Sequence, residues 1–508
     1  MARIAVIGAG MGAMAAAARL AVAGHRVAVY ERAQTYGGAL GAVEREGFRF
    51  DTGPGLLHLP AVWRDLFLKT GREPLEKCVD LAPVSPASRH VFADGTDVSL
   101  PDASRAGIVS ALESALGAGA GERWGEFLGR ARDAWDRSRR PLLEEPLWSD
   151  WRVLERDPYP APRRRAFLRS RQASTVAEVG AWELTDPRLA ALFEAYALAY
   201  GLDPRHAPAG AALLPYMEQT FGTWYVAGGM RELARAVYER CLARRVAFHF
   251  DAEVTSILEK DGRAAGVELA DGTAVAADHV VVGGSATAAA RLAGRDLWQD
   301  DDVQPQDDGR ALPGRFTVLL ALRGAPGSGT PGEGVAHRTV VHSPDPAAEA
   351  AAIFSGRPAE RPTVTVLRPC DPRTVPDEAH EAVTVTATVP GHGADRPGGV
   401  DWTDPALRER YAKVLLDAAG AAFGRPSEIR ERLLWQEVLT PAETGSLPAP
   451  SLAGPGGRRL HPANTTRLPG LHLVGGHAHP GGGLAHSGMS GALVAGLIVE
   501  GPGFRGSQ

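Results

Sequence analysis

The chain has 508 residues, too many for a single hydrophobic core, so we expect two or three domains. Its 44% hydrophobic and 23% charged residues are typical of a globular protein, and a net charge of -5 argues against nucleic acid as a partner. No CxxC pair, no signal sequence and no run of about 20 apolar residues is present, so we expect a cytoplasmic protein that at most attaches to a membrane face.

The N-terminal residues predict a strand–turn–helix–strand unit. An apolar strand over 3–7 is followed by an alanine-rich helix over 14–23 and a second strand over 25–30. The turn before the helix has the sequence Gly8-Ala9-Gly10-Met11-Gly12-Ala13, and Glu31 follows its first glycine by 23 positions. The combination of strand, GxGxx(G/A) turn, helix and acid predicts dinucleotide binding. The glycine run at 117–121 lacks the strand and the acid, so we expect it to connect two helices.

Each part of this unit has a physical role. Gly8 permits the tight turn, and Gly10 lets the backbone approach a pyrophosphate at the helix N-terminus. Glu31 is expected to accept hydrogen bonds from the adenosine ribose, where an arginine would favour a 2′-phosphate. The residues expected to contact the cofactor in this unit are Gly8, Gly10, Met11, Gly12, Ala13, Glu31 and Arg32.

The next segments carry a family resemblance. Tyr36-Gly37-Gly38-Ala39-Leu40 precedes Gly47-Phe48-Arg49-Phe50-Asp51-Thr52-Gly53-Pro54. This pattern resembles the phytoene desaturase and carotenoid isomerase-like family of FAD-dependent oxidoreductases, relatives of the amine oxidases, which have a GG(R/K) turn followed by GFxFDxGP near the flavin. The basic residue of that turn is Ala39 here, so one phosphate or ribose contact is missing. The resemblance implies FAD as cofactor, with contacts from Gly38, Ala39, Leu40, Gly53, Pro54 and Gly55.

The C-terminal region carries the most specific part of the resemblance. Residues 469–483, with Val474-Gly475-Gly476 and His479-Pro480-Gly481-Gly482-Gly483, are similar to the family's closing LYLVG…HPGGG…SG signature. The signature implies a strand, a glycine loop and a helix whose N-terminus stabilises negative charge on the reduced flavin. Residues 221–230 look like the turn and helix start that lead back into the FAD domain. The resemblance places further contacts at Val254, Gly475, Gly476, Gly488, Met489 and Ser490.

These segments predict an α/β protein with a discontinuous Rossmann-type FAD-binding domain and an inserted α+β substrate domain. The FAD domain is expected over 1–66, 222–292 and 456–508, and the substrate domain over 67–221 and 293–455. The first insert has helical patterning, and the second has strand-like runs at 315–322 and 382–389.

Several motifs that the sequence lacks narrow the classes of reaction that it could catalyse. No second GxGxxG is present, which favours oxygen, a quinone or a transient NAD(P)H as the electron partner. No redox cysteine pair follows the first unit, which argues against a disulfide reductase. None of the 4 lysines lies in a predicted site segment, which disfavours a simple amine oxidase.

Histidines in the glycine-rich segments are candidate catalytic residues. His479 matches the family position best, His58, His477 and His486 are further candidates, and each has a structural role as its alternative. No carboxylate lies beside them in sequence, so we expect no metal site. The basic segment 163–171 predicts either contact with an anionic membrane surface or a solvated linker.

The favoured hypothesis is a phytoene desaturase-like oxidoreductase that desaturates or isomerises a long apolar or polyene substrate. Its first alternative is a reductive cyclase that uses NADPH-reduced flavin on a polyketide-type polyene. The second alternative is a flavin-binding protein without turnover. The sequence predicts neither the substrate nor the oligomeric state.

Overall fold

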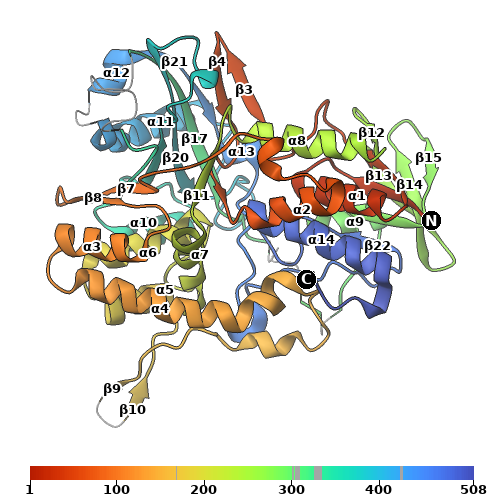
Figure 1. The fold of residues 1–508 in the computed structure, drawn as a ribbon, viewed down its shortest axis with the longest axis horizontal. Coiled ribbons are helices and arrows are strands. Elements are labelled where there is room, and N and C mark those ends of the chain that lie inside the picture. The colour runs from red at the N-terminus through yellow and green to blue at the C-terminus, as the bar shows by residue number, and fades with distance from the viewer. Residues whose placement is uncertain (167–168, 300–301, 304–308, 325–334, 424–426, 508) are drawn as a thin grey trace.

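The computed structural model describes residues 1–166, 169–299, 302–303, 309–324, 335–423 and 427–507, and it has the mixed α/β fold that the sequence predicts (Figure 1). One layer is a five-stranded sheet in the order β12-β2-β1-β16-β22. Its strands are β1 (Arg3–Ile7), β2 (Arg26–Tyr30), β12 (Ala247–His249), β16 (His279–Val282) and β22 (Leu471–Leu473). All neighbouring strands are parallel, so their carboxyl ends meet at one edge, where ligands bind in sheets of this kind.

Alternate residues of the central strands face two different cores. Val6 and Val281 pack against the helices on one face, whereas Ala5 and Val280 pack on the opposite face. The helices of the first face are α1 (Met11–Val22), α2 (Ala61–Gly71), α8 (Met230–Ala243) and α14 (Leu484–Glu500). The opposite face is covered by β13 (Val254–Lys260), β14 (Arg263–Leu269), β15 (Ala274–Ala276) and α9 (Ala286–Ala293). The domain limits stay a prediction, and the limit at residue 66 falls within α2.

A second sheet has seven strands in the order β21-β17-β20-β19-β18-β7-β8. These are β7 (Ser88–Val91), β8 (Asp97–Leu100), β17 (Gly314–Arg323), β18 (Arg338–Val341), β19 (Val364–Leu367), β20 (His380–Val389) and β21 (Leu433–Leu439). The strand-like runs at 315–322 and 382–389 are therefore β17 and β20, which pair with each other in antiparallel register. The helices α11 (Pro405–Ala419) and α12 (Glu428–Arg432) pack on this sheet through one apolar cluster.

A helical layer lies beside the second sheet (Figure 1). It contains α3 (Arg105–Leu116), α4 (Ala120–Arg139), α5 (Val176–Val179), α6 (Pro187–Ala199) and α7 (Leu213–Phe221), which share one hydrophobic cluster. The glycine run at 117–121 joins α3 to α4, as the sequence predicts. A single π-helical turn, Arg140–Glu144, continues α4. Helices α10 (Pro346–Phe354) and α13 (Pro441–Thr444) lie in the second insert.

Short strands join these layers. The strand β11 (Thr223–Val226) pairs with both β5 (Leu57–His58) and β6 (Leu81–Pro83), and β3 (Ala42–Arg45) forms a hairpin with β4 (Phe48–Asp51). The first two pairings bring residues 57–58 and 81–83 together on either side of β11.

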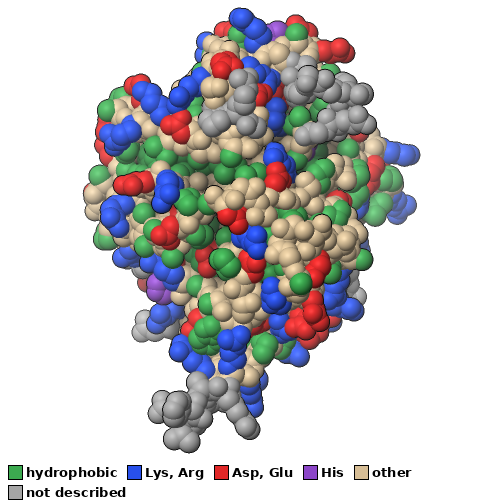
Figure 2. All heavy atoms as spheres, turned by 90° about the vertical axis from the view of Figure 1, so that its left-hand side faces the viewer, with side chains coloured by type: hydrophobic (Ala, Val, Ile, Leu, Met, Phe, Trp, Pro, Cys, Tyr) green, Lys and Arg blue, Asp and Glu red, His purple; other side chains and the backbone are tan. Residues whose placement is uncertain are grey.

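The basic segment 163–171 forms a hairpin that projects from the helical layer (Figure 1). Its strands are β9 (Arg164–Ala166) and β10 (Arg169–Arg171), and Phe167 and Leu168 lie outside the described residues. Membrane contact by this segment stays a prediction. In the described part of the chain, no helix is both long and apolar enough to cross a membrane. Figure 2 shows basic and acidic side chains interspersed over one face of the molecule, so neither sign of charge dominates that face.

Candidate active site

The turn between β1 and α1 has the geometry of an anion site. Gly8 has a φ of +90°, which a residue with a side chain rarely adopts. Gly10 is the N-cap of α1, and no side chain caps this helix. A Cβ atom on Gly10 would meet no described atom within 4 Å, so the backbone is open on this side. An uncapped helix N-terminus beside an open glycine is suited to a phosphate group.

The remaining residues of this turn have packing roles. Met11 and Ala13 are buried. A Cβ atom on Gly12 would lie 2.8 Å from the carbonyl oxygen of Ser487 and 2.9 Å from the Cα of Gly475. A side chain at position 12 would block this approach. Gly12 therefore allows α1 to pack against the C-terminal glycine segment.

The carboxylate of Glu31 is fixed against the glycine turn. It accepts hydrogen bonds from the backbone N–H groups of Ala9, at 2.7 Å, and Ala33, at 2.8 Å. A carboxylate can accept about four hydrogen bonds, so both oxygens can also accept from ribose hydroxyls. Arg32 is exposed beside it, and Val254 is buried at the start of β13.

The paired-glycine turn packs directly on the first turn. The N–H of Gly37 donates to the carbonyl of Ala9 at 2.8 Å. Gly38 has a φ of +57°, and a Cβ atom on it would lie 3.1 Å from the Cα of Gly10. Ala39 is exposed and Leu40 is buried. The turn thus lies against the open backbone of Gly10.

The segment after β4 packs on the same turn. A Cβ atom on Gly53 would lie 2.2 Å from the carbonyl oxygen of Ala39, and one on Gly55 would lie 2.6 Å from Cδ1 of Leu367 in β19. Glycine is therefore needed at position 53, where the neighbour is backbone, whereas at position 55 the Leu367 side chain would have to shift. Pro54 lies between them, half-buried.

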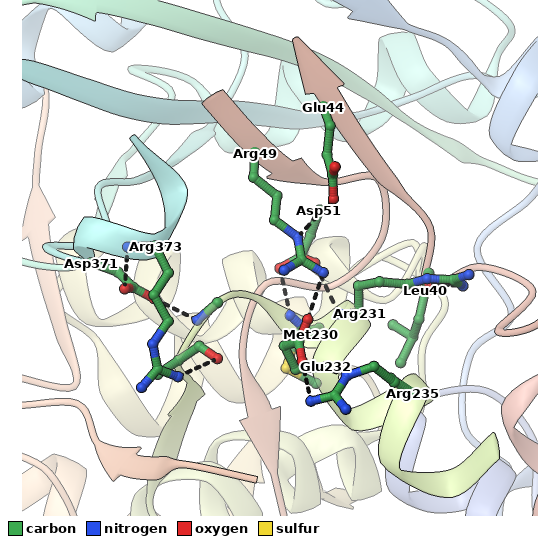
Figure 3. A network of polar contacts seen from close by, with 12 residues as sticks. Leu40, Glu44, Arg49, Asp51, Met230, Arg231, Glu232, Arg235, Asp371 and Arg373 are labelled. Carbon is green, nitrogen blue, oxygen red and sulfur yellow. Dashed lines mark hydrogen bonds and ion pairs between the residues drawn. The ribbon is translucent and has the colours of Figure 1, made fainter. Parts of the chain in front are cut away.

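Asp51 joins this segment to α8 (Figure 3). Its carboxylate accepts from the N–H groups of Met230, at 2.8 Å, and Arg231, at 3.1 Å. Burial raises the pKa of Asp51 to about 6 despite these bonds. Nearby, Arg49 forms an ion pair with Glu232 at 2.7 Å.

A recess of about 470 Å³ lies between this network and the second sheet. The rings of Tyr225 and His337 contact each other in it at a tilted angle of 59°, with centroids 4.7 Å apart, and the Tyr225 hydroxyl donates to Asp371. The residues that line the recess are Arg49, Phe50, Asp51, Gly53, Gly55, Tyr225, Gly228, Gly229, His337, Leu367, Pro369, Thr374, Ala382 and Thr384. Two of the predicted cofactor contacts, Gly53 and Gly55, are among them.

The closing segment forms a second open glycine loop. Gly475 has a φ of +102°, and a Cβ atom on it would meet no described atom within 4 Å. Its N–H donates to Oγ of Ser490, which also accepts from the side-chain amide of Asn464. Gly483 is the N-cap of α14 and, like Gly10 in α1, has no side-chain cap on its helix. The loop therefore places the open backbone of Gly475 beside α1, close to Gly12.

The other predicted residues of this segment lie in packing contacts, with Gly476 half-buried and Gly488 and Met489 buried. A Cβ atom on Gly488 would lie 2.8 Å from Val62, and one on Gly476 would lie 3.1 Å from Pro448. Met489 is 8% exposed and lies in the core of the helical layer. Direct cofactor contact by these residues stays a prediction.

The candidate histidines lie in three different environments. His479 is fully buried, and its Nε2 lies 2.9 Å from the carbonyl oxygen of Glu145. His58 Nε2 lies 3.5 Å from Glu218, which also pairs with Arg338. Burial lowers the pKa of His479 and of His486 to about 4, and it lowers the pKa of His58 and of His477. These imidazoles are therefore mainly neutral at pH 7.

His486 borders a small hollow with mostly apolar walls. The hollow lies between α4 with its π turn, α7, the loop at 450–452 and the first turn of α14. Its lining residues are Trp135, Ser138, Arg139, Leu142, Leu143, Leu213, Leu214, Met217, Pro450, Ser451, Leu452 and His486. Sequence reasoning did not identify these apolar residues, because their helical spacing is also typical of an ordinary core.

A comparison with protein families assigns the chain to one of them. Residues 14–499 match the model of the flavin containing amine oxidoreductase family. The chain belongs to this family. The protein is therefore a flavin-dependent oxidoreductase, and the resemblance inferred from its sequence is confirmed.

Its curated relatives include carotenoid enzymes. A hydroxyneurosporene desaturase of Cereibacter sphaeroides is 30% identical over 98% of this chain and 97% of its own length. A neurosporene-forming phytoene desaturase of Rhodobacter capsulatus is 30% identical over 99% and 95%. A 4,4'-diapolycopene oxygenase of Methylomonas is 28% identical over 98% of both chains.

Solved structures share the fold. An oxidoreductase from Methanosarcina mazei has a TM-score of 0.62 at 17% identity, and the match covers 97% of this chain and 99% of that one. A putrescine oxidase variant has a TM-score of 0.63 at 14% identity, with 98% and 99% covered. At these identities the similarity shows the fold alone.

Proposed function

We propose that the protein binds FAD and moves hydride between FAD and a long apolar or polyene substrate, in a desaturation or an isomerisation. The observation that carries this proposal is the apolar hollow that ends at His486, on the first turn of α14. The resemblance of the closing segment to the family's signature implies that the flavin ring lies near this helix N-terminus. The carotenoid desaturases among the relatives support a substrate of this class.

The residues present fit FAD. Gly10, the N-cap of α1, and Gly475, in the loop before α14, both leave open backbone, and neither helix has a side-chain cap, which suits the pyrophosphate and the ring. Glu31 has free acceptor capacity for the ribose. When bound, FAD would supply the hydride acceptor.

The lining of the hollow suits a substrate that carries no charge. Apart from Arg139, which is 48% exposed and lies 3.8 Å from Glu144, its side chains are uncharged at pH 7. Apolar walls orient a long chain and exclude water. In a desaturation, hydride leaves one carbon with its electron pair, and the neighbouring carbon loses a proton to water or to neutral His486. A double bond forms between the two carbons.

Anaerobic spectroscopy of the purified holoprotein tests this proposal. In a desaturation, we expect an acyclic carotenoid such as neurosporene, added in detergent micelles, to bleach the oxidised flavin absorbance and to yield a product with longer conjugation. In an isomerisation, we expect the flavin spectrum to stay unchanged while the carotenoid changes its double-bond geometry. NADPH added alone should leave the flavin oxidised. If NADPH bleaches the flavin and the carotenoid is neither desaturated nor isomerised, the proposal is wrong and the reductive cyclase becomes the better hypothesis.

A further inference from the structure

The paired-glycine turn lacks its basic residue at Ala39, yet an arginine from another element reaches it. We infer that Arg231, in the first turn of α8, replaces that basic residue: it holds the turn in place and supplies positive charge for the FAD pyrophosphate. This inference rests on FAD as the cofactor in the proposed function and does not depend on the substrate.

Arg231 binds the turn from both ends. Its Nη1 donates to the carbonyl of Leu40 at 3.0 Å and also to the carbonyl of Tyr36, and its Nη2 donates to the hydroxyl of Thr35 at 2.5 Å. The guanidinium carbon lies 4.1 Å from the centre of the Tyr36 ring, a cation–π contact. Figure 3 shows the side chain extending from α8 towards Leu40. One side chain therefore spans the turn.

Gly37 and Asp51 position Arg231 for its contacts with the paired-glycine turn. A Cβ atom on Gly37 would lie 2.4 Å from Nη1 of Arg231, so the guanidinium occupies space that only a glycine leaves free. The backbone N–H of Arg231 is fixed by Asp51 at 3.1 Å. The segment after β4 thus sets where α8 begins, and α8 sets where the turn lies.

The charge of Arg231 is not cancelled by a carboxylate. Among the described residues, its guanidinium contacts only carbonyl and hydroxyl oxygens and a ring, and Asp51 binds its backbone. The nearby arginines differ, because both Arg49 and Arg235 pair with Glu232. An unpaired cation in a turn packed on Gly10 raises the electrostatic potential at the phosphate position.

The test compares Arg231→Met with Arg235→Met, a matched control on the same helix whose side chain is 46% exposed. The dissociation constant of FAD is measured by titrating apoprotein and following flavin fluorescence. We expect R231M to weaken FAD binding by about tenfold, the effect of losing charge-assisted contacts, and R235M to change it by less than about twofold. Equal dissociation constants for the two variants would overturn the inference.

Ala39→Arg gives an independent measurement if R231M does not fold. Alone, A39R should tighten FAD binding by less than about threefold, because Arg231 already provides the cation. In the R231M background it should recover most of the lost affinity. A tenfold gain from A39R alone would show that the site lacks a cation and would overturn the inference. Failure of the wild-type protein to bind FAD would instead contradict the proposed function.

Discussion

Asp51 is a half-buried carboxyl group whose ionisation is coupled to folding. Its pKa is about 6 in the folded protein, above the ordinary value of 3.8 that applies when the chain is unfolded. A raised folded-state pKa stabilises the protein at low pH, and this contribution is lost as the pH rises through 6. Between pH 5 and pH 7 the loss amounts to about 1.3 kcal/mol of unfolding free energy.

Asp51→Asn removes this titration while keeping an acceptor oxygen for α8. We expect the unfolding free energy of the apoprotein to fall less between pH 5 and pH 7 in D51N than in the wild type, by about 1 kcal/mol. Chemical denaturation at the two pH values measures the difference. Identical pH dependence in both proteins would show that the carboxyl group is not buried as described.

Single residues of the site differ in how far the sequence could predict them. The placement of Gly8, Gly10 and Glu31 follows from local backbone requirements at fixed spacing, so the motif was sufficient to locate them. Arg231 contacts Leu40 across 191 positions, and no local pattern indicates that contact. The segment singled out from the sequence, 221–230, ends one residue before it.

At the scale of elements, the contact between α1 and α14 aligns the two open helix N-termini. A Cβ atom on Gly491 would lie 2.7 Å from the carbonyl oxygen of Gly12 and 2.8 Å from Cβ of Ala15. Gly491→Ala therefore forces the helices apart, and we expect it to lower the unfolding free energy by about 1–3 kcal/mol. Gly284→Ala is the matched control, since its Cβ would meet no described atom closer than 3.9 Å.

Denaturant unfolding of the two apoproteins measures this difference. A G491A protein as stable as G284A would show that the helices can separate without loss, which contradicts the described packing. We also expect G491A to weaken FAD binding, because the separation moves Gly12 away from Gly475.

Local sequence patterns predicted some of the strands of the second sheet and missed others. The strand-like runs at 315–322 and 382–389 predicted β17 and β20 correctly. The helical pattern of the first insert did not indicate β7 and β8, which are four residues each and join the second sheet through parallel pairing with β18. That pairing links positions about 250 apart in the chain, for example Thr339 with Arg89, and depends on the assembled fold.

At the scale of the whole molecule, the apolar hollow exists only after distant segments assemble. Leu143, Leu213, Leu452 and His486 come from four separate parts of the chain. Each apolar residue alone is typical of a helix core, and only the tertiary structure shows that they border empty space. The open glycine turns were therefore predictable from motifs, whereas the hollow was not.

Filling this hollow should affect the substrate and leave the cofactor unchanged. Leu213→Phe adds a ring to the wall contributed by α7, so we expect KM for neurosporene to rise by about tenfold as favourable apolar contact is lost. Leu213→Ile, which conserves volume, should change KM by less than about threefold. Both variants should bind FAD with wild-type affinity, because Leu213 is not among the residues that form the glycine turns. If L213F leaves KM unchanged, the substrate lies elsewhere, and the recess beside Gly53 and Gly55 becomes the better candidate.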